Sequence, residues 1–85
     1  MRLTKTRRFI EDYAALPAQV QRRVDQRLLS LVENIAHPSL RVKRVRRYEG
    51  VLEGSVNVSY RFLFQVTAGA YVLLRVGKHD ILGKR

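Results

Sequence analysis

The stretch Val58-Ser-Tyr-Arg-Phe-Leu-Phe-Gln-Val66, followed by Ala70-Tyr-Val-Leu-Leu-Arg-Val-Gly-Lys-His-Asp80, decides the fold of this chain. Both runs are rich in β-branched and aromatic residues, and the spacer Thr67-Ala68-Gly69 contains a glycine. Two such runs joined by a short loop with a glycine predict an antiparallel hairpin.

Side chains alternate between the two faces of a strand, so the residues of each run can be divided by face. In the first run, one face takes Tyr60, Phe62, Phe64 and Val66, and the other takes Arg61, Leu63 and Gln65. In the second run, one face takes Val72, Leu74 and Val76, and the other takes Tyr71, Leu73, Arg75, Gly77 and His79. This division predicts that Arg61, Arg75 and His79 share one side of a sheet whose other side is core.

Helical periodicity comes earlier in the chain. Thr4 or Thr6 can cap a first helix, in which Phe9, Tyr13 and Leu16 recur at steps of four and three. A second helix is predicted from Pro17 to Ala36, and its apolar residues recur at the same kind of spacing: Val20, Val24, Leu28, Leu31 and Ile35. His37-Pro38-Ser39 ends it, because the residue before a proline is pushed out of the helical conformation.

Further strands are expected on both sides of these helices. Met1 to Leu3 is a weak edge strand, Leu40 to Arg47 is a strand with a bulge or an early end, and Leu52 to Val58 alternates as a third. Strands that follow helices in this way predict an α+β fold, with two N-terminal helices packed on one face of a four-stranded, mainly antiparallel sheet. The 85 residues fit a single domain spanning 1–85.

Charge is the strongest compositional signal. Seventeen Lys and Arg against seven Asp and Glu give a net charge of +10, which calls for an anionic partner: nucleic acid first, then an acidic protein or an anionic membrane. The alternative is a solvated surface that serves solubility. The chain has no Cys, which excludes thiolate metal sites and Cys nucleophiles and fits a reducing cytoplasm. No signal peptide or membrane-spanning stretch is expected.

Few residues can carry chemistry. The sequence has no glycine-rich phosphate loop, no His pair at metal-ligand spacing and no nucleophile elbow. His37 is expected to be an exposed loop residue, whereas His79, at the end of a core strand, is either a general acid or base or a strand-end His paired with Asp80. Arg61 either salt-bridges an acid such as Glu53 or contacts a ligand. The basic run 41–47 is either a solvated face or a track for a phosphate backbone.

One imidazole in a cationic cleft suggests RNA cleavage by transesterification. The reaction needs a base for the ribose 2′-hydroxyl proton, positive groups around the phosphate and an acid for the leaving oxygen, and it requires no metal or other cofactor. His79 is the candidate acid or base. The candidate phosphate-binding residues are Lys43, Arg44, Arg46, Arg61, Arg75 and Lys78.

These residues also carry a resemblance to a known family. The order of elements, His37-Pro38-Ser39-Leu40, Tyr60-Arg61 and Gly77-Lys78-His79-Asp80 resemble the RelE/ParE superfamily of toxins from toxin–antitoxin pairs, over essentially the whole chain. The resemblance to the RelE branch implies cleavage of mRNA in the ribosomal A site in the cytoplasm. It also implies that His79 and Arg61 are the catalytic residues, with Arg61 in contact with the phosphate, and that a cognate antitoxin blocks the activity and sets the oligomeric state.

The sequence departs from the patterns of this superfamily at three places. At the positions that match two strand lysines of RelE the chain has Leu52 and Gly54, and the C-terminal aromatic of RelE has no counterpart in 81–85. The branch that is rich in histidine has further catalytic His and Asp residues upstream, and here only His37 is available. Glu53, Arg44 and Arg46 are the candidate substitutes for the missing groups. Two alternatives stay open: a ParE-like inhibitor of DNA gyrase without a nuclease site, and an inactive basic domain that only binds nucleic acid or its antitoxin.

Overall fold

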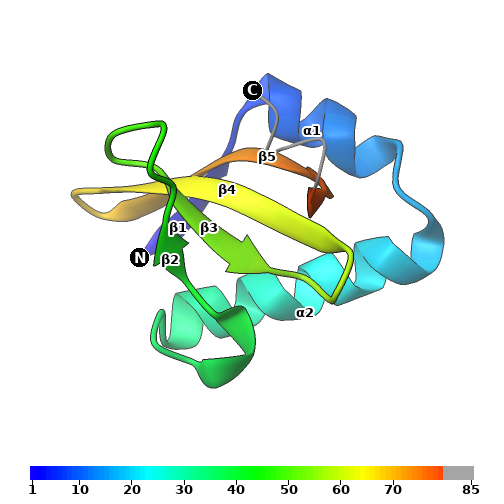
Figure 1. The fold of residues 1–85 in the computed structure, drawn as a ribbon, viewed down its shortest axis with the longest axis horizontal. Coiled ribbons are helices and arrows are strands. Elements are labelled where there is room, and N and C mark those ends of the chain that lie inside the picture. Colours follow the sequence, from blue (N-terminus) through cyan, green and yellow to red (C-terminus); the bar gives the residue numbers. More distant parts are fainter. Residues whose placement is uncertain (80–85) are drawn as a thin grey trace.

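The computed structural model describes residues 1–79, in which a five-stranded sheet is packed against two helices (Figure 1). The predicted α+β class is confirmed. The elements are, in chain order, β1 (Arg2–Lys5), α1 (Arg7–Ala14), α2 (Ala18–Glu33), the 3₁₀ turn η1 (Pro38–Leu40), β2 (Lys43–Arg44), β3 (Leu52–Ser55), β4 (Tyr60–Thr67) and β5 (Ala70–Lys78).

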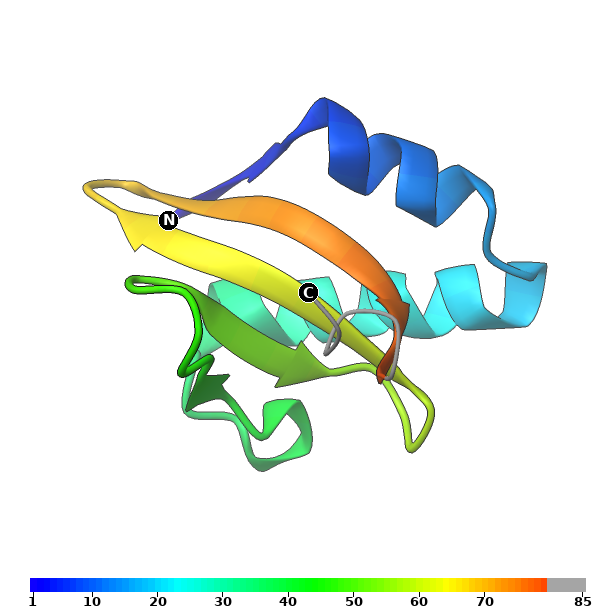
Figure 2. The same ribbon diagram turned by 45° about the horizontal axis from the view of Figure 1, so that its top comes forward.

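The sheet has five strands where the sequence predicted four. Its order is β1-β5-β4-β3-β2, with β1 parallel to β5 and every other neighbouring pair antiparallel. The weak N-terminal strand joins because it can pair with the edge of β5, with Leu3 opposite Tyr71. Figure 2 shows how α2 crosses one face of the sheet while α1 lies along β5.

The β4–β5 hairpin is confirmed, with a tighter loop than expected. Thr67 is still paired with Ala70, so only Ala68 and Gly69 connect the strands. Gly69 has a φ of +98°, a backbone conformation that glycine adopts without steric cost.

The predicted division of β5 by face is wrong for its first half, because the pairing register shifts. Leu63 lies opposite Arg75, but the next residue, Phe64, lies opposite Leu73, so Leu74 is an extra residue in β5. Such a bulge reverses the alternation of the strand. Tyr71 and Leu73 therefore face the core together with Val76, whereas Arg75 remains on the outward side as predicted.

The helices begin where capping chemistry predicts, but they end somewhat earlier than the sequence predicted. Thr6 caps α1, because its Oγ1 accepts a hydrogen bond from the Phe9 amide at 3.2 Å. The second helix ends at Glu33 rather than Ala36. Asn34 ends it, since Asn34 is extended and its Oδ1 accepts from the Ala36 amide in a local turn.

The basic segment, residues 41–47, is mostly irregular, whereas the sequence predicted a strand from Leu40 to Arg47. Arg41 adopts a left-handed conformation with φ of +46°, and only Lys43 and Arg44 pair with β3. The third predicted strand is also shorter and ends at Ser55, because the Asn57 side chain accepts from the Ser59 and Tyr60 amides and builds a turn.

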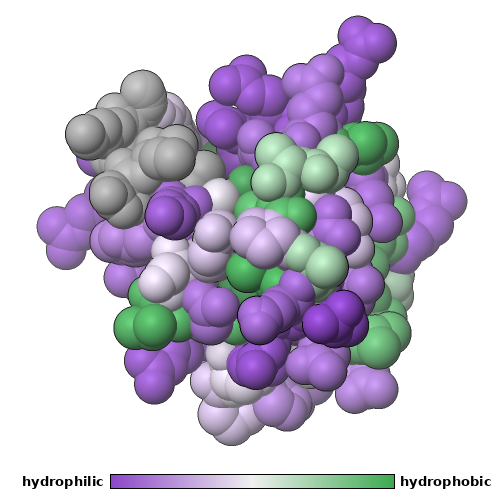
Figure 3. Space-filling view, turned by 90° about the vertical axis from the view of Figure 1, so that its right-hand side faces the viewer, coloured by the Kyte–Doolittle hydropathy of each residue, from purple (hydrophilic) through white to green (hydrophobic). Residues whose placement is uncertain are grey.

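A single core joins the helices to one face of the sheet. The largest fully buried side chains are Phe9, Phe62, Phe64, Leu31, Leu40, Leu73, Val24, Val56 and Val76. The surface over the α1–α2 connection is mostly hydrophilic, with small apolar patches between the polar side chains (Figure 3). Within residues 1–79, neither helix has the length and apolarity that crossing a membrane requires.

Candidate nucleic-acid site

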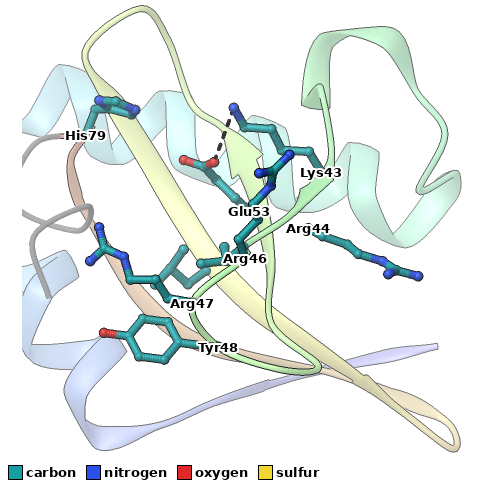
Figure 4. A pocket seen from close by; sticks show the side chains of 9 residues that line it. Lys43, Arg44, Arg46, Arg47, Tyr48, Glu53 and His79 are labelled. Atoms are coloured by element: carbon teal, nitrogen blue, oxygen red, sulfur yellow. Dashed lines mark ion pairs between the residues drawn. The ribbon is translucent and has the colours of Figure 1, made fainter.

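The basic segment folds over the face of the sheet that the helices leave open, and a pocket of about 520 Å³ lies between them. Four cationic side chains come from this segment, and the sheet supplies Glu53, Leu63 and His79. Figure 4 shows these side chains from close by. The full lining is Lys43, Arg44, Val45, Arg46, Arg47, Tyr48, Glu53, Leu63 and His79.

Glu53 is the acid of this pocket, and two cations hold it. Its Oε1 lies 3.8 Å from Lys43 Nζ, and its Oε2 lies 3.8 Å from Arg61 Nε. The side chain is only 14% exposed, so this charge depends on its partners. Both separations exceed hydrogen-bond length, which leaves the carboxylate oxygens able to accept a proton from a ligand.

Arg61 reaches the site through Glu53 and does not line the pocket. Its Nη1 donates to the carbonyl oxygens of Asn57 and Tyr60, which ties the guanidinium to the β3–β4 turn. The salt bridge to Glu53 that the sequence offered as one alternative is therefore present. A role for Arg61 at a phosphate stays a prediction.

His79 is exposed at the end of β5, and its ring lies at the rim of the pocket (Figure 4). Its amide donates to the Ser59 carbonyl at 2.9 Å, so the β3–β4 turn also fixes its backbone. The alternative partner named for His79, Asp80, lies outside the described residues. His37, by contrast, caps η1, with Nδ1 accepting from the Ser39 amide at 3.2 Å, as an exposed loop residue.

Of the other predicted phosphate-binding residues, three line the pocket and two, Lys78 and Arg75, do not. Lys43, Arg44 and Arg46 line the pocket, and Arg44 points away from its centre in Figure 4. Lys78 lies opposite Tyr60 in the register, on the face away from His79. Arg75 is bound by Asp12 of α1, and this hydrogen-bonded pairing raises the pKa of Arg75 even though desolvation lowers it.

Leu52 and Gly54 cannot be vacant lysine positions of this site. Gly54 lies opposite Phe62 and Leu52 opposite Phe64, so both face the core. A Cβ at Gly54 would lie 2.4 Å from Phe62 Cζ. The outward positions of β3 are Glu53 and Ser55.

From the sequence, Glu53 was expected only as a salt-bridge partner or a substitute, and Tyr48 was not singled out. A signal for Glu53 was available, because strict alternation around Leu52 and Gly54 places Glu53 on the same face as Arg61. Tyr48 had no such signal, because its loop follows no strand or helix period. Among residues 1–79, no three His, Asp or Glu side chains gather where they could hold a metal ion.

The fold and the pocket define a class: a small, highly basic α+β protein that presents an acid, an imidazole and several cations on the open face of its sheet. Comparison with known proteins identifies the class further. Residues 3–82 match the sequence profile of the family described as "ParE toxin of type II toxin-antitoxin system, parDE". The chain belongs to this family of toxins, which confirms the predicted RelE/ParE superfamily.

Solved structures share the fold at low sequence identity. The YoeB/ParE toxin from Agrobacterium tumefaciens is 13% identical with a TM-score of 0.80, covering 93% of this chain and 99% of that one. YafQ from E. coli is 15% identical with a TM-score of 0.76, covering 96% and 98%. RelE, in the RelB–RelE complex from Methanococcus jannaschii, is 15% identical with a TM-score of 0.71, covering 93% of each chain. No functionally curated protein matches the chain.

Proposed function

We propose that this toxin is an endoribonuclease that cleaves mRNA in the ribosomal A site and so inhibits translation in the cytoplasm. One observation carries the proposal: Glu53 and His79, an acid and an imidazole, line the same pocket as Lys43, Arg44, Arg46 and Arg47. A cationic pocket attracts the phosphate backbone, and a carboxylate and an imidazole are side chains that serve as general acid and base.

The proposed reaction uses side chains alone. The Glu53 carboxylate takes the proton of the ribose 2′-hydroxyl, and the oxygen attacks phosphorus. The bond to the 5′-oxygen breaks, and the protonated imidazole of His79 gives its proton to that leaving oxygen, producing a 2′,3′-cyclic phosphate. Lys43 and Arg46 stabilise the added negative charge of the transition state. Arg61 keeps Glu53 in position and stays the candidate phosphate contact on the sheet.

Cell-free translation with added protein, followed by primer extension on the message, tests this function. Cuts are expected only on messages that are being translated. His79→Ala and Glu53→Gln are each expected to lower the cutting rate by about 100-fold or more, a typical contribution of general acid–base catalysis. His37→Ala, which removes the other imidazole, serves as the matched control. An intact message and normal protein output would overturn the proposal.

The family match itself supports a second candidate, inhibition of DNA gyrase, because the matching profile is that of ParE toxins. A supercoiling assay separates the two functions. Inhibition of gyrase that survives His79→Ala, together with an intact message in the translation assay, would establish this candidate in place of the nuclease.

The proposed protein partner is a cognate antitoxin, since the related RelE and YafQ toxins have been solved in complex with their antitoxins. Arg23 and Arg27 of α2 favour an acidic antitoxin segment. Burial lowers the pKa of Arg27, repulsion from Arg23 lowers it further, and Arg27 Nε is buried without a hydrogen-bond partner in the described structure. An acid laid along this face of α2 relieves both costs.

A further inference from the structure

A second pocket, of about 910 Å³, lies on the other side of the same basic segment. The two pockets share the stretch from Arg44 to Tyr48 as a common wall. The second pocket differs in its other walls, which are the start of β3 at Leu52 and the end of β4 at Val66. A ligand held in the first pocket can therefore extend into the second by passing over residues 44–48.

The lining of the second pocket combines apolar area with positive charge. Val66 is 48% exposed and Tyr48 40% exposed, although both are large apolar side chains. Arg44, Arg46 and Arg47 also line the pocket, against one acid, Glu49. An exposed aromatic ring among arginines is the combination with which proteins bind single-stranded nucleic acid, because the ring stacks on a base and the cations follow the backbone.

The segment that carries Tyr48 is held by its own backbone. The Val45 amide donates to the Val51 carbonyl at 3.0 Å, and the Val51 amide donates to the Tyr48 carbonyl at 3.2 Å. Gly50, with φ of +78°, completes this turn. The backbone below the ring is thus ordered before a ligand arrives, which lowers the entropic cost of stacking.

We propose that the second pocket binds a nucleobase of single-stranded RNA, stacked on Tyr48, next to the nucleotide whose phosphate occupies the first pocket. The inference rests on the proposed RNA-cleaving function and adds a subsite to it. The ring and the apolar floor favour a base over an acidic peptide, because carboxylates would leave Tyr48, Leu52 and Val66 without a matching surface.

The chain contains no Trp, so Tyr48→Trp introduces a single indole as a reporter. The probe is a short 2′-O-methyl RNA, which lacks the attacking hydroxyl and cannot be cleaved by transesterification. A second probe of equal length and charge carries abasic sites. Quenching of the indole by the first probe and little quenching by the second is the expected result. Equal quenching by both probes, or by neither, would overturn the proposal.

Affinity for the same probe gives a second test. Tyr48→Ala is expected to weaken binding by about 5-fold to 100-fold, the range for loss of one stacked base, while Tyr48→Phe retains it. Equal affinities of the Ala and Phe variants would contradict stacking. An acidic peptide that quenches Tyr48→Trp where RNA does not would assign the pocket to a protein partner instead.

The outcomes also separate this subsite from the proposed catalysis. Neither probe can be cleaved, so base-dependent quenching with an uncut message would support the subsite and remove only the nuclease. Cleavage of translated mRNA without base-dependent quenching would remove only the subsite.

Discussion

The carboxylate of Asp12 on α1 binds the guanidinium of Arg75 on β5, with Oδ2 2.7 Å from Nε and Oδ1 3.2 Å from Nη2. The same Oδ2 accepts from the Val76 amide at 3.1 Å. One side chain thus satisfies a charge and a backbone donor on β5 and attaches α1 to that strand. This arrangement gives Arg75 a structural role, and its contact with phosphate stays a prediction.

Removing Asp12 is therefore expected to destabilise the fold. Asp12→Ala should lower the free energy of unfolding by about 1–3 kcal/mol, because it leaves a charged donor and an amide without their acceptor. Asp12→Asn should cost less, since its amide oxygen can still accept from Val76. Denaturant unfolding of both Asp12 variants and of Arg75→Ala measures these losses in unfolding free energy. Strictly additive losses in the Asp12→Ala, Arg75→Ala double variant would show that the pair is not coupled.

Any side chain at Gly54 is expected to destabilise the fold. A Cβ would lie 2.4 Å from Phe62 Cζ, and Phe62 is fully buried, so the core has to shift. Gly54→Ala should cost about 1–3 kcal/mol of unfolding free energy. Ser55→Ala, at the adjacent outward position, is the matched control for the same measurement. Equal stability of the two variants would mean that β3 is paired in another register.

Thr6 has two roles at the start of α1. Its Oγ1 accepts from the Phe9 amide and lies 2.9 Å from the Leu73 carbonyl oxygen, to which the hydroxyl donates. Thr6→Ala should lower the free energy of unfolding by about 1–2 kcal/mol, whereas Thr6→Ser should keep most of the stabilisation because it retains the hydroxyl. Thr4→Ala, an exposed threonine on β1, is the control. A loss as large in Thr4→Ala would assign the effect to the strand rather than to the cap.

Tyr13 is expected to make stability fall at alkaline pH. Its hydroxyl donates to Asp25 Oδ1 at 2.9 Å, and this hydrogen bond, with burial and the Asp25 charge, raises the pKa of Tyr13 above its ordinary value. The folded state then holds the phenolic proton more tightly than the unfolded state. Its stabilisation is complete below the unfolded pKa and disappears as pH rises through the folded pKa. Unfolding measured from neutral to strongly alkaline pH should show a shallower decline for Tyr13→Phe than for Tyr48→Phe.

Arg46 is expected to contribute to the salt dependence of RNA binding. Each phosphate contact removed should lower the slope of log affinity against log salt by about 0.7 for a single strand. Anisotropy titrations of a labelled, non-cleavable RNA at several salt concentrations measure that slope for Arg46→Ala. Arg22→Ala, an exposed arginine on α2, controls for net charge. The same slope for both variants would place the RNA elsewhere.

Local chemistry made much of the fold predictable from the sequence. The alternation around Phe62 and Phe64 gave β4, the spacing of Val24, Leu28 and Leu31 gave α2, and Thr6 was one of the two expected caps. The extra residue at Leu74 could not be foreseen, because the residues from Tyr71 to Leu74 are all apolar and show no alternation that would mark a shift. The parallel pairing of β1 depends on an edge of β5 that exists only after the hairpin has formed.

The site was predictable in part for the same reason. Lys43, Arg46 and His79 were candidates because their residue types are rare elsewhere or clustered in the sequence, and the pocket brings them together. Alternation around Leu52 and Gly54 could have placed Glu53 on the face of Arg61, whereas Tyr48 acquires its place only through a backbone-held turn. Nothing in the sequence indicated an ion-pair partner for Arg75, because Asp12 lies 63 residues earlier in the chain.

The pairing of β1 with β5 also determines how late in synthesis the sheet and its core can be completed. Leu3 can pair with Tyr71 only after all the residues between them have been synthesised, and Leu73 and Val76 of the core come later still. Contacts between such distant parts of a chain form late and slowly. A growing polypeptide therefore carries two amphipathic helices without the strands that cover them, and the pocket with His79 at its rim is among the last parts to be assembled.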